Sequence, residues 1–220
     1  MLKGLILEHN ILGMSLSVLT FAQRVKSIAD IGLLYSKDAY DRERYTELHE
    51  LALELMGQLV NEPIEIIKNF YTPVTDYPTP KVDVRAFVVN EKGEILLAKE
   101  GADGRWSLPG GWADIGLTAS EVAVKEVKEE TGLTVKAKRL LAVFDKKMHP
   151  HPPQPYYVYK MVILCEADGA TAFTAGFDML EAAFFPVDQL PELSEDRILK
   201  SQIESLYYNY KNNVLVPLAD

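Results

Sequence analysis

The chain of 220 residues contains a single cysteine, Cys165, and no apolar run of about 18 residues or more. One cysteine cannot form a disulfide within one chain, which is typical of proteins in the reducing cytoplasm. Because a membrane-spanning helix needs about 20 mostly apolar residues, no such helix is expected. Cys165 itself lies in the apolar segment VILCEA and is expected to be a buried free thiol.

Basic residues are also scarce, since 23 lysines and arginines stand against 32 aspartates and glutamates, a net charge of −9 and a pI near 5.0. A protein that binds long nucleic acid through its charge needs a basic surface, so this class is disfavoured. A small nucleotide is still compatible, because bound cations can offset carboxylates locally. With 48% hydrophobic residues, the chain can form one large domain or a domain with a smaller companion.

The N-terminal part has the pattern of a small helical domain. Apolar residues recur at helical spacing over residues 19–34 and again over residues 38–59. Asn61-Glu-Pro63 predicts the start of a third, short helix, because proline suits the first helical turn.

Changes in composition indicate the domain boundaries. The segment TPVTDYPTPK, residues 72–81, carries three prolines and predicts a linker. We therefore expect a helical domain over residues 14–71 and a second domain over residues 82–220. A translation start at Met14 would make residues 1–13 an extension.

Beyond the linker the pattern changes to strands. The expected strands are residues 82–89, 94–98, 135–144, 156–166 and 181–187, and the expected last helix runs from Leu193 to Lys211. Asn90-Glu-Lys-Gly predicts a hairpin turn between the first two strands.

The most informative segment is GWADIGLTASEVAVKEVKEETGL, residues 111–133. Thr118 and Glu121 form a T-x-x-E capping box, and Gly132 suits a helix end in the left-handed region. Three carboxylates of this helix fall on one face: Glu126, Glu129 and Glu130. Because like charges at this spacing repel, a hard divalent cation is expected beside them. The alternative is an ordinary amphipathic helix with a solvated acidic face, which the flanking PGGW disfavours.

The same segment resembles the Nudix box, G-x5-E-x7-R-E-U-x-E-E-x-G-U, in which U is a bulky aliphatic residue. The matching positions are Gly111, Glu126, Val127, Glu129, Glu130, Gly132 and Leu133. Two positions depart from the pattern, because Leu117 stands at the first glutamate and Lys125 at the arginine. Lys125 keeps the charge but lacks the planar, two-pronged geometry of arginine.

A second resemblance covers Ala22–Met56, most clearly in GLLYSKDAYDRERY. This segment is similar to the helical domain that precedes the Nudix domain in hydrolases of X-linked nucleoside diphosphates, such as CDP-choline pyrophosphatases. Together the resemblances imply an α/β (α+β) fold, a Nudix α/β/α sandwich with a mixed sheet after a small helical domain. They also imply a homodimer held by the helical domain.

The Nudix resemblance implies a metal-dependent pyrophosphohydrolase that cleaves a nucleoside diphosphate linked to X into a nucleoside monophosphate and X-phosphate. Mg²⁺ or Mn²⁺ would be held by Glu126, Glu129 and Glu130, with a backbone carbonyl of Gly110 or Gly111. Lys125 would hold a metal-binding glutamate in place. CDP-choline is the first substrate expected, and ADP-ribose is the second.

Glu181 is the leading candidate for a catalytic carboxylate outside the box, because it precedes AAFF as a glutamate does in related sequences. The alternative interpretation is a charge at the edge of a sheet. Asp178 and Glu166 are weaker candidates.

Four residues are expected to contact the substrate: Arg85, Arg105, Trp106 and His149. Arg85 lies in the apolar segment VDVRAFVV and needs an anionic partner, either a substrate phosphate or an internal carboxylate. Trp106 can instead be a packing residue. His149 and His151 lie in a proline-rich loop that can cover the site, or they are ordinary surface residues.

A binding or sensing module with the Nudix fold but without turnover is the alternative function. Leu117 and Lys125 motivate it, because both depart from the box. The intact acidic face of the helix favours the enzyme.

Overall fold

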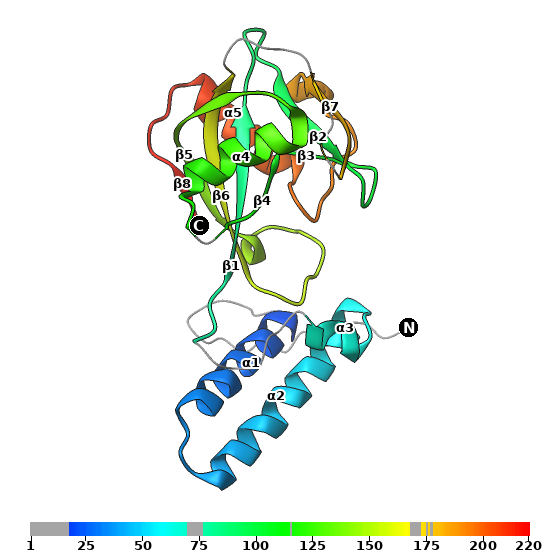
Figure 1. Cartoon of the computed structure of the whole chain (residues 1–220), viewed down its shortest axis with the longest axis vertical. Coiled ribbons are helices and arrows are strands. Elements are labelled where there is room, and N and C mark those ends of the chain that lie inside the picture. Colours follow the sequence, from blue (N-terminus) through cyan, green and yellow to red (C-terminus); the bar gives the residue numbers. More distant parts are fainter. Residues whose placement is uncertain (1–17, 70–76, 115, 168–172, 175, 177) are drawn as a thin grey trace. The chain divides into compact units, whose positions relative to one another are not determined.

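The computed structural model describes residues 18–69, 77–114, 116–167, 173–174, 176 and 178–220 (Figure 1). The chain divides into two compact units. The first comprises Met1–Pro80 with Pro153–Tyr157, and the second comprises Lys81–Pro152 with Val158–Asp220. The expected extension over residues 1–13 and the first half of the expected linker lie outside the described residues.

The described part of the first unit contains the helices α1 (Val18–Tyr35), α2 (Ala39–Val60) and α3 (Ile64–Asn69). All were predicted from the sequence, and their bounds agree closely. Asp38 caps α2 by accepting hydrogen bonds from the backbone N–H groups of Tyr40 and Asp41, and Asn61 ends it in the left-handed region. A small core joins the helices through Ala22, Leu53, Met56 and Ile67.

A buried charged group connects α1 to α2. Lys26 donates to Asp30 at 2.6 Å, and Nδ1 of His49 lies 2.7 Å from the other oxygen of Asp30. Burial alone would raise the pKa of the Asp30 carboxyl, but its bonds to His49 and Lys26 outweigh burial and hold that pKa below its usual value.

In the second unit, the described strands form two sheets. The first sheet has the order β4-β1-β6-β5-β8, with β1 (Lys81–Val88), β4 (Gly110–Trp112), β5 (Val135–Asp145), β6 (Val158–Ala167) and β8 (Leu218–Ala219). The second has the order β3-β2-β7, with β2 (Ile95–Glu100), β3 (Trp106–Ser107) and β7 (Met179–Phe185). Since β1 pairs in parallel with β6 and antiparallel with β4, the larger sheet is mixed, as expected.

The five predicted strands are present as β1, β2, β5, β6 and β7. The strands β3, β4 and β8 were not predicted, because two or three residues are too few to show alternation. The expected turn after β1 forms as well, since the N–H of Gly93 donates to the carbonyl of Asn90.

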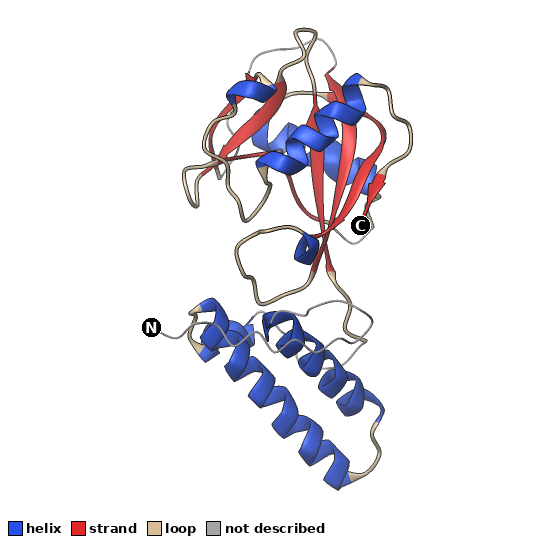
Figure 2. Cartoon of the chain, turned by 180° about the vertical axis from the view of Figure 1, so that it is seen from behind, coloured by secondary structure: helices blue, strands red, loops and turns tan. Residues whose placement is uncertain are grey.

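Two helices cover opposite faces of the larger sheet, namely α4 (Ala119–Thr131) and α5 (Lys200–Lys211) (Figures 1 and 2). Alternation along β1 explains the two layers. On one face, Val84, Ala86 and Val88 join a core with Val122, Ala123 and Val127 of α4. On the other face, Phe87 joins a core with Ile203 and Leu206 of α5. The predicted α/β/α sandwich is confirmed.

The last helix begins at Lys200, so the prediction of a start at Leu193 was wrong. Leu193 instead forms a parallel bridge with Trp106, and the N–H of Ser194 donates to the Trp106 carbonyl. These bonds hold Leu193 and Ser194 against β3. The chain then makes a separate turn, in which the N–H groups of Arg197 and Ile198 donate to the Ser194 carbonyl, before α5 begins.

Cys165 is buried on β6 as a free thiol, as predicted, and burial raises the pKa of that thiol to about 12. In the described part of the chain, no helix is both long enough and apolar enough to cross a membrane.

Candidate active site

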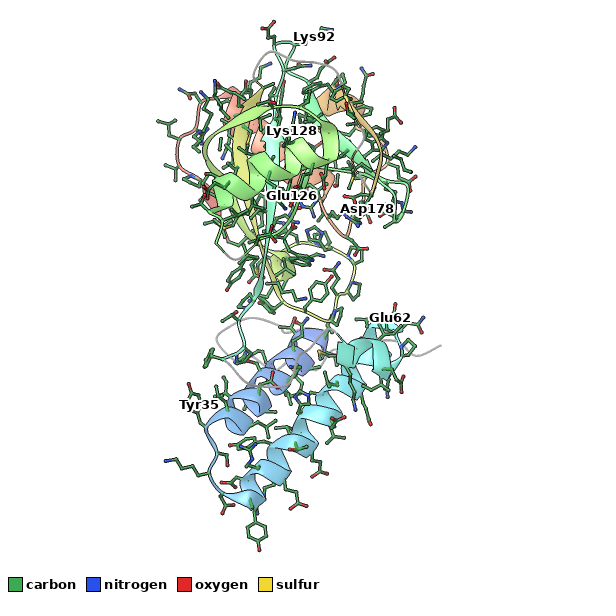
Figure 3. The ribbon with its side chains drawn as sticks, in the orientation of Figure 1. Tyr35, Glu62, Lys92, Glu126, Lys128 and Asp178 are labelled. Carbon is green, nitrogen blue, oxygen red and sulfur yellow. The ribbon has the colours of Figure 1, made fainter. Side chains whose placement is uncertain are left out.

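The helix α4 begins and ends where the sequence predicts (Figure 3, which labels Glu126 and Lys128 on it). The Glu121 carboxylate accepts the backbone N–H of Thr118, and the Thr118 hydroxyl accepts the backbone N–H of Glu121, which completes the capping box. Gly132 ends the helix with φ of 75°. These caps set the two ends of the helix, and its apolar residues Val122, Ala123 and Val127 turn one face to the sheet.

Glu130 is joined to the edge strand β4. Its Oε2 accepts a hydrogen bond from the backbone N–H of Gly110 at 3.1 Å. Burial raises the pKa of the Glu130 carboxyl to about 8, and the Arg85 guanidinium and the Gly110 bond oppose the rise without cancelling it. The contacts within the chain therefore do not replace the hydration that charged Glu130 loses.

Glu126 lies against the other glycine of β4. Its side chain is 15% exposed, and a Cβ atom built on Gly111 would come within 3.3 Å of the Glu126 carboxylate. Glycine therefore lets this carboxylate lie close to the backbone. Burial raises the pKa of Glu126, although Lys125 acts in the opposite direction.

Gly110 is required by the close pairing of β4 with β1. It lies opposite Arg85 in the ladder with φ of 150°, and a Cβ atom there would come within 2.1 Å of the Val84 carbonyl oxygen. Only glycine fits this position without displacing the strand.

Lys125 makes several ion pairs along the acidic face. Its Nζ lies 3.1 Å from Asp114, 3.2 Å from Glu129 and 3.5 Å from Glu126. The hydrogen bond to Asp114, followed by that to Glu129, raises the pKa of Lys125. The lysine thus contacts two of the three box glutamates, and Asp114 is a partner that the sequence did not reveal.

The chemistry of the donors fits a hard cation such as Mg²⁺, which commonly takes one or two carboxylates together with waters. Glu126 and Glu130 supply partly buried carboxylates with raised pKa values, and the backbone of β4 lies close to both, at Gly111 and Gly110. In the described residues, no three side chains of His, Cys, Asp or Glu are grouped closely enough to hold a metal. Glu129 is the outlying member, with a side chain that is 58% exposed.

Arg85 is buried on β1 and has internal partners. Its Nε donates to Asp83 at 3.0 Å, and its guanidinium also donates to the Leu108 carbonyl at 3.0 Å. Glu100 lies 4.0 Å away. Of the two partners considered from the sequence, an internal carboxylate is therefore the one present, and a contact with substrate stays a prediction.

Arg105 and Trp106 are adjacent in the sequence, but Arg105 lies on the surface and Trp106 in the core. Arg105 forms an exposed ion pair with Glu192 at 2.9 Å. Trp106 is buried and packs edge-on against Phe185, with ring centroids 4.8 Å apart. The packing interpretation of Trp106 thus has direct support.

The side chain of His149 contacts Asp220, since its Nε2 lies 2.9 Å from the Asp220 carboxylate. His151 is held elsewhere, with Nδ1 2.6 Å from the carbonyl oxygen of Glu195. The two histidines are therefore fixed by different partners.

Glu181 is exposed on β7, the outer strand of the smaller sheet, where it lies opposite Lys99 of β2. This strand packs against α4, which carries the box glutamates. Asp178, also exposed, accepts the Gly101 N–H through its carbonyl, and Glu166 forms an ion pair with Lys138 at 2.7 Å. A catalytic role for Glu181 stays a prediction.

Sequence reasoning missed a buried charged network behind Glu130. Asp83 pairs with both Arg85 and Lys160. Glu100 accepts a hydrogen bond from the Ser107 hydroxyl at 2.7 Å and forms an ion pair with Arg197 at 3.0 Å. One signal was available, since Lys160 interrupts an apolar strand just as Arg85 does.

Both parts of the chain match known protein families. Residues 17–71 match the family described as UDP-X-like, N-terminal oligomerisation domain, and residues 79–206 match the NUDIX domain. The chain is 48% identical over 186 residues to a Bacillus subtilis protein, YjhB, provisionally named an ADP-ribose pyrophosphatase. That alignment covers 84% of this chain and 88% of the relative. An ADP-ribose pyrophosphatase of Methanocaldococcus jannaschii is 34% identical over 73% of this chain and 92% of its own length.

Solved structures give the same result. A UDP-X diphosphatase structure is 36% identical, with a TM-score of 0.60, and the match covers 92% of this chain and 97% of that one. An ADP-ribose pyrophosphatase from Streptococcus suis is also 36% identical, with a TM-score of 0.58 over 64% of this chain and all of that one. The chain therefore belongs to the Nudix hydrolases and carries the N-terminal oligomerisation domain of their UDP-X-like members.

Proposed function

We propose that this Nudix hydrolase is a metal-dependent pyrophosphohydrolase that cleaves a nucleoside diphosphate linked to X into a nucleoside monophosphate and X-phosphate. The observation that carries the proposal is the bond from Gly110 to Glu130, with Glu126 beside Gly111 on the same strand. A divalent cation would supply the positive charge that these two carboxylates need.

The roles of the residues follow from their positions. Glu126, Glu130 and a carbonyl of Gly110 or Gly111 would hold Mg²⁺ or Mn²⁺, with Glu129 at the exposed side. The bound cation would offset the charge of the pyrophosphate and lower the pKa of a bound water. Lys125 keeps Glu126 and Glu129 in place through its ion pairs. Glu181 is proposed as a further carboxylate, because β7 packs against α4.

ADP-ribose and CDP-choline are the proposed substrates. The names of two relatives, from Bacillus subtilis and Methanocaldococcus jannaschii, support ADP-ribose. The resemblance of the helical domain to that of CDP-choline pyrophosphatases supports CDP-choline. Arg105, which is exposed, stays a proposed contact for either substrate.

A homodimer through the first unit is part of the proposal, because residues 17–71 match an oligomerisation domain. Three large apolar side chains of α1 lie seven residues apart and are exposed: Phe21, Ile28 and Tyr35. Spacing of this kind places them along one side of a helix, where a second copy of α1 would bury them.

A second candidate function, ligand binding without turnover, is favoured by one observation. The ammonium group of Lys125 lies 3.2 Å from Glu129 and 3.1 Å from Asp114, so a cation of the chain itself already pairs with a box glutamate. If these pairs persist in the presence of metal, Glu129 would not be a ligand.

The test is a phosphatase-coupled assay of phosphate release with Mg²⁺ or Mn²⁺. The panel comprises ADP-ribose, CDP-choline, nucleotide sugars and dinucleoside polyphosphates. We expect metal-dependent turnover of at least one member and a higher melting temperature with metal. Folded protein that is silent across the panel and unshifted by millimolar metal would favour the binding module.

A further inference from the structure

The ring of His151 presents a nitrogen atom without a protein partner. Its Nδ1 lies 2.6 Å from the carbonyl oxygen of Glu195, and because a carbonyl only accepts, Nδ1 carries the proton. Its Nε2 is buried and has no hydrogen-bond partner. Among the described residues, the amide nitrogen of Gln202 is the other buried side-chain atom in that state.

The unpartnered nitrogen of His151 is an acceptor. Burial lowers the pKa of His151 to about 4, and Lys146 and Lys160 contribute to the fall. The ring is therefore neutral at pH 7, and Nε2 keeps its lone pair. A buried acceptor without a protein donor is costly, so its complement is an O–H or N–H group, either of a water or of a ligand that displaces it.

Two lysines lie within electrostatic reach of this ring. Nζ of Lys146 donates to the carbonyl oxygen of Asp196 at 2.7 Å, and Lys160 pairs with Asp83 in the interior. Burial lowers the pKa of each lysine to about 8; neighbouring cations add to the fall, while Asp83 opposes it in both. A ligand that complements these ammonium groups is an anion.

The lysines belong to the same charged network as the box glutamates. Asp83 pairs with Lys160 on one side and with Arg85 on the other, and the charge of Glu130 in turn acts on Arg85. Ion pairs thus lead from Arg85, which feels the charge of Glu130, to Lys160 in the interior, and the charge of Lys160 acts on Lys146 and His151.

We propose that Lys146 and His151 form a subsite for the X-phosphate half of the substrate, with Lys146 binding a phosphate oxygen and Nε2 of His151 accepting a hydroxyl hydrogen of X. Lys160 adds positive charge from the interior. Since Nε2 is covered by protein atoms, a ligand reaches it when the loop after β5 shifts. The inference rests on the proposed function and narrows it to substrates in which X is a sugar.

Choline provides the contrast, because its oxygen is esterified in CDP-choline and no hydroxyl is left to donate. The test is calorimetric titration of the full-length, metal-free protein with ribose 5-phosphate, phosphocholine and inorganic phosphate. We expect ribose 5-phosphate to bind about tenfold or more tightly than phosphocholine, from one additional hydrogen bond to a buried acceptor. Equal affinities for the two esters would overturn the proposal.

Variants separate the two contacts. His151→Phe should remove the preference for ribose 5-phosphate, whereas His151→Gln, which keeps an acceptor, should retain part of it. Lys146→Met should weaken all three ligands about tenfold or more. Lys147→Met is the matched control, since Lys147 is exposed and pairs with Asp145 at 3.3 Å, and it should leave affinity unchanged. Unaltered binding in His151→Phe or Lys146→Met would refute the assignment.

The two proposals fail in different ways. If no member of the nucleotide panel is hydrolysed with metal, the proposed enzyme is wrong, whatever ribose 5-phosphate does. If the panel is hydrolysed but kcat/KM for ADP-ribose does not fall relative to CDP-choline in His151→Phe, the enzyme stands and the sugar subsite is wrong.

Discussion

The backbone N–H of Gly110 donates to the carboxylate of Glu130 at 3.1 Å, and this bond ties the edge strand β4 to the helix α4. The strand offers backbone groups, and the helix offers carboxylates. Each half is held independently, β4 by its ladder with β1 and α4 by its two caps. Their meeting point is therefore preorganised, as a site for a cation and a pyrophosphate needs to be.

Glu130→Gln should abolish metal-dependent turnover while leaving the fold intact. The amide is of nearly the same size and can still accept the Gly110 N–H, but it carries no charge for a cation. We expect kcat to fall at least about 100-fold. Steady-state kinetics and circular dichroism measure the two effects. Glu204→Gln on α5, exposed and 3.8 Å from Lys200, is the control and should behave as wild type. Retained activity in Glu130→Gln would place the metal elsewhere.

The stability of metal-free protein should fall with rising pH because of Glu130. Its pKa is about 8 in the folded chain against 4.5 for an ordinary glutamate, so folding favours the protonated form. That stabilisation is complete below about pH 4.5 and is lost as the pH rises through about 8. Relative to Glu130→Gln, wild type should lose roughly a few kcal/mol over this window. Urea unfolding with a chelator, at both ends of the window, measures it. Parallel pH profiles of the two proteins would contradict the assignment.

The part of the site that lies on α4 could be predicted from the sequence, because caps and helical period are local signals. Thr118, Glu121 and Gly132 fixed the helix ends, and the spacing of the glutamates fixed their common face. The position of Gly110 was less visible. Its role depends on a three-residue strand and on contact with Glu130, which is twenty residues away, and neither leaves a periodic pattern.

The charged network could not be predicted for a different reason. Arg85 indicated that an anion was needed. Asp83 lies two residues away on the same face of β1, so alternation alone allows that pair, whereas Glu100 comes near Arg85 only through the approach of β2. Lys160 reaches Asp83 only because β6 lies parallel to β1. Long-range pairing of this kind is set by topology, and the sequence shows the charges without their partners.

Gly110→Ala should damage both stability and turnover. A methyl group there would lie 2.1 Å from the Val84 carbonyl oxygen, so β4 must move away from β1 and from Glu130. We expect a loss of at least about 2 kcal/mol in the free energy of unfolding. The matched control is Gly104→Ala, which also has positive φ, 68°, but no atom within 4 Å of the added carbon. It should cost only about 1 kcal/mol. Similar losses in the two variants would show that close packing at Gly110 is unimportant.

The double variant Leu117→Glu with Lys125→Arg restores the family pattern and should fold normally. Leu117 is 39% exposed, and the Lys125 side chain is 38% exposed, so neither change disturbs the core. Arginine can contact two carboxylates at once where lysine acts as a point charge. We expect kcat/KM to rise, and Lys125→Ala to lower it, because Glu126 and Glu129 lose their shared cation. A double variant no faster than wild type would mean that the natural site already works without the missing glutamate.

Asp30→Asn should destabilise the helical unit strongly, because it removes a carboxylate charge that Lys26 and His49 both contact. Lys26 and Asp30 are 6% and 3% exposed, and breaking a buried ion pair from one side typically costs about 3–5 kcal/mol. Asp41→Asn is the control, since Asp41 pairs with Arg44 at 2.9 Å on the surface, and this substitution should cost under about 1 kcal/mol.

Since the pKa of Asp30 is lowered on folding, its contribution to stability is present at neutral pH and is lost as the pH falls below about 4. Chemical denaturation at pH 7 compares the variants, and size-exclusion chromatography shows whether the proposed dimer depends on the same unit. Equal losses in the two variants would mean that burial of this pair adds nothing to the stability of α1 against α2.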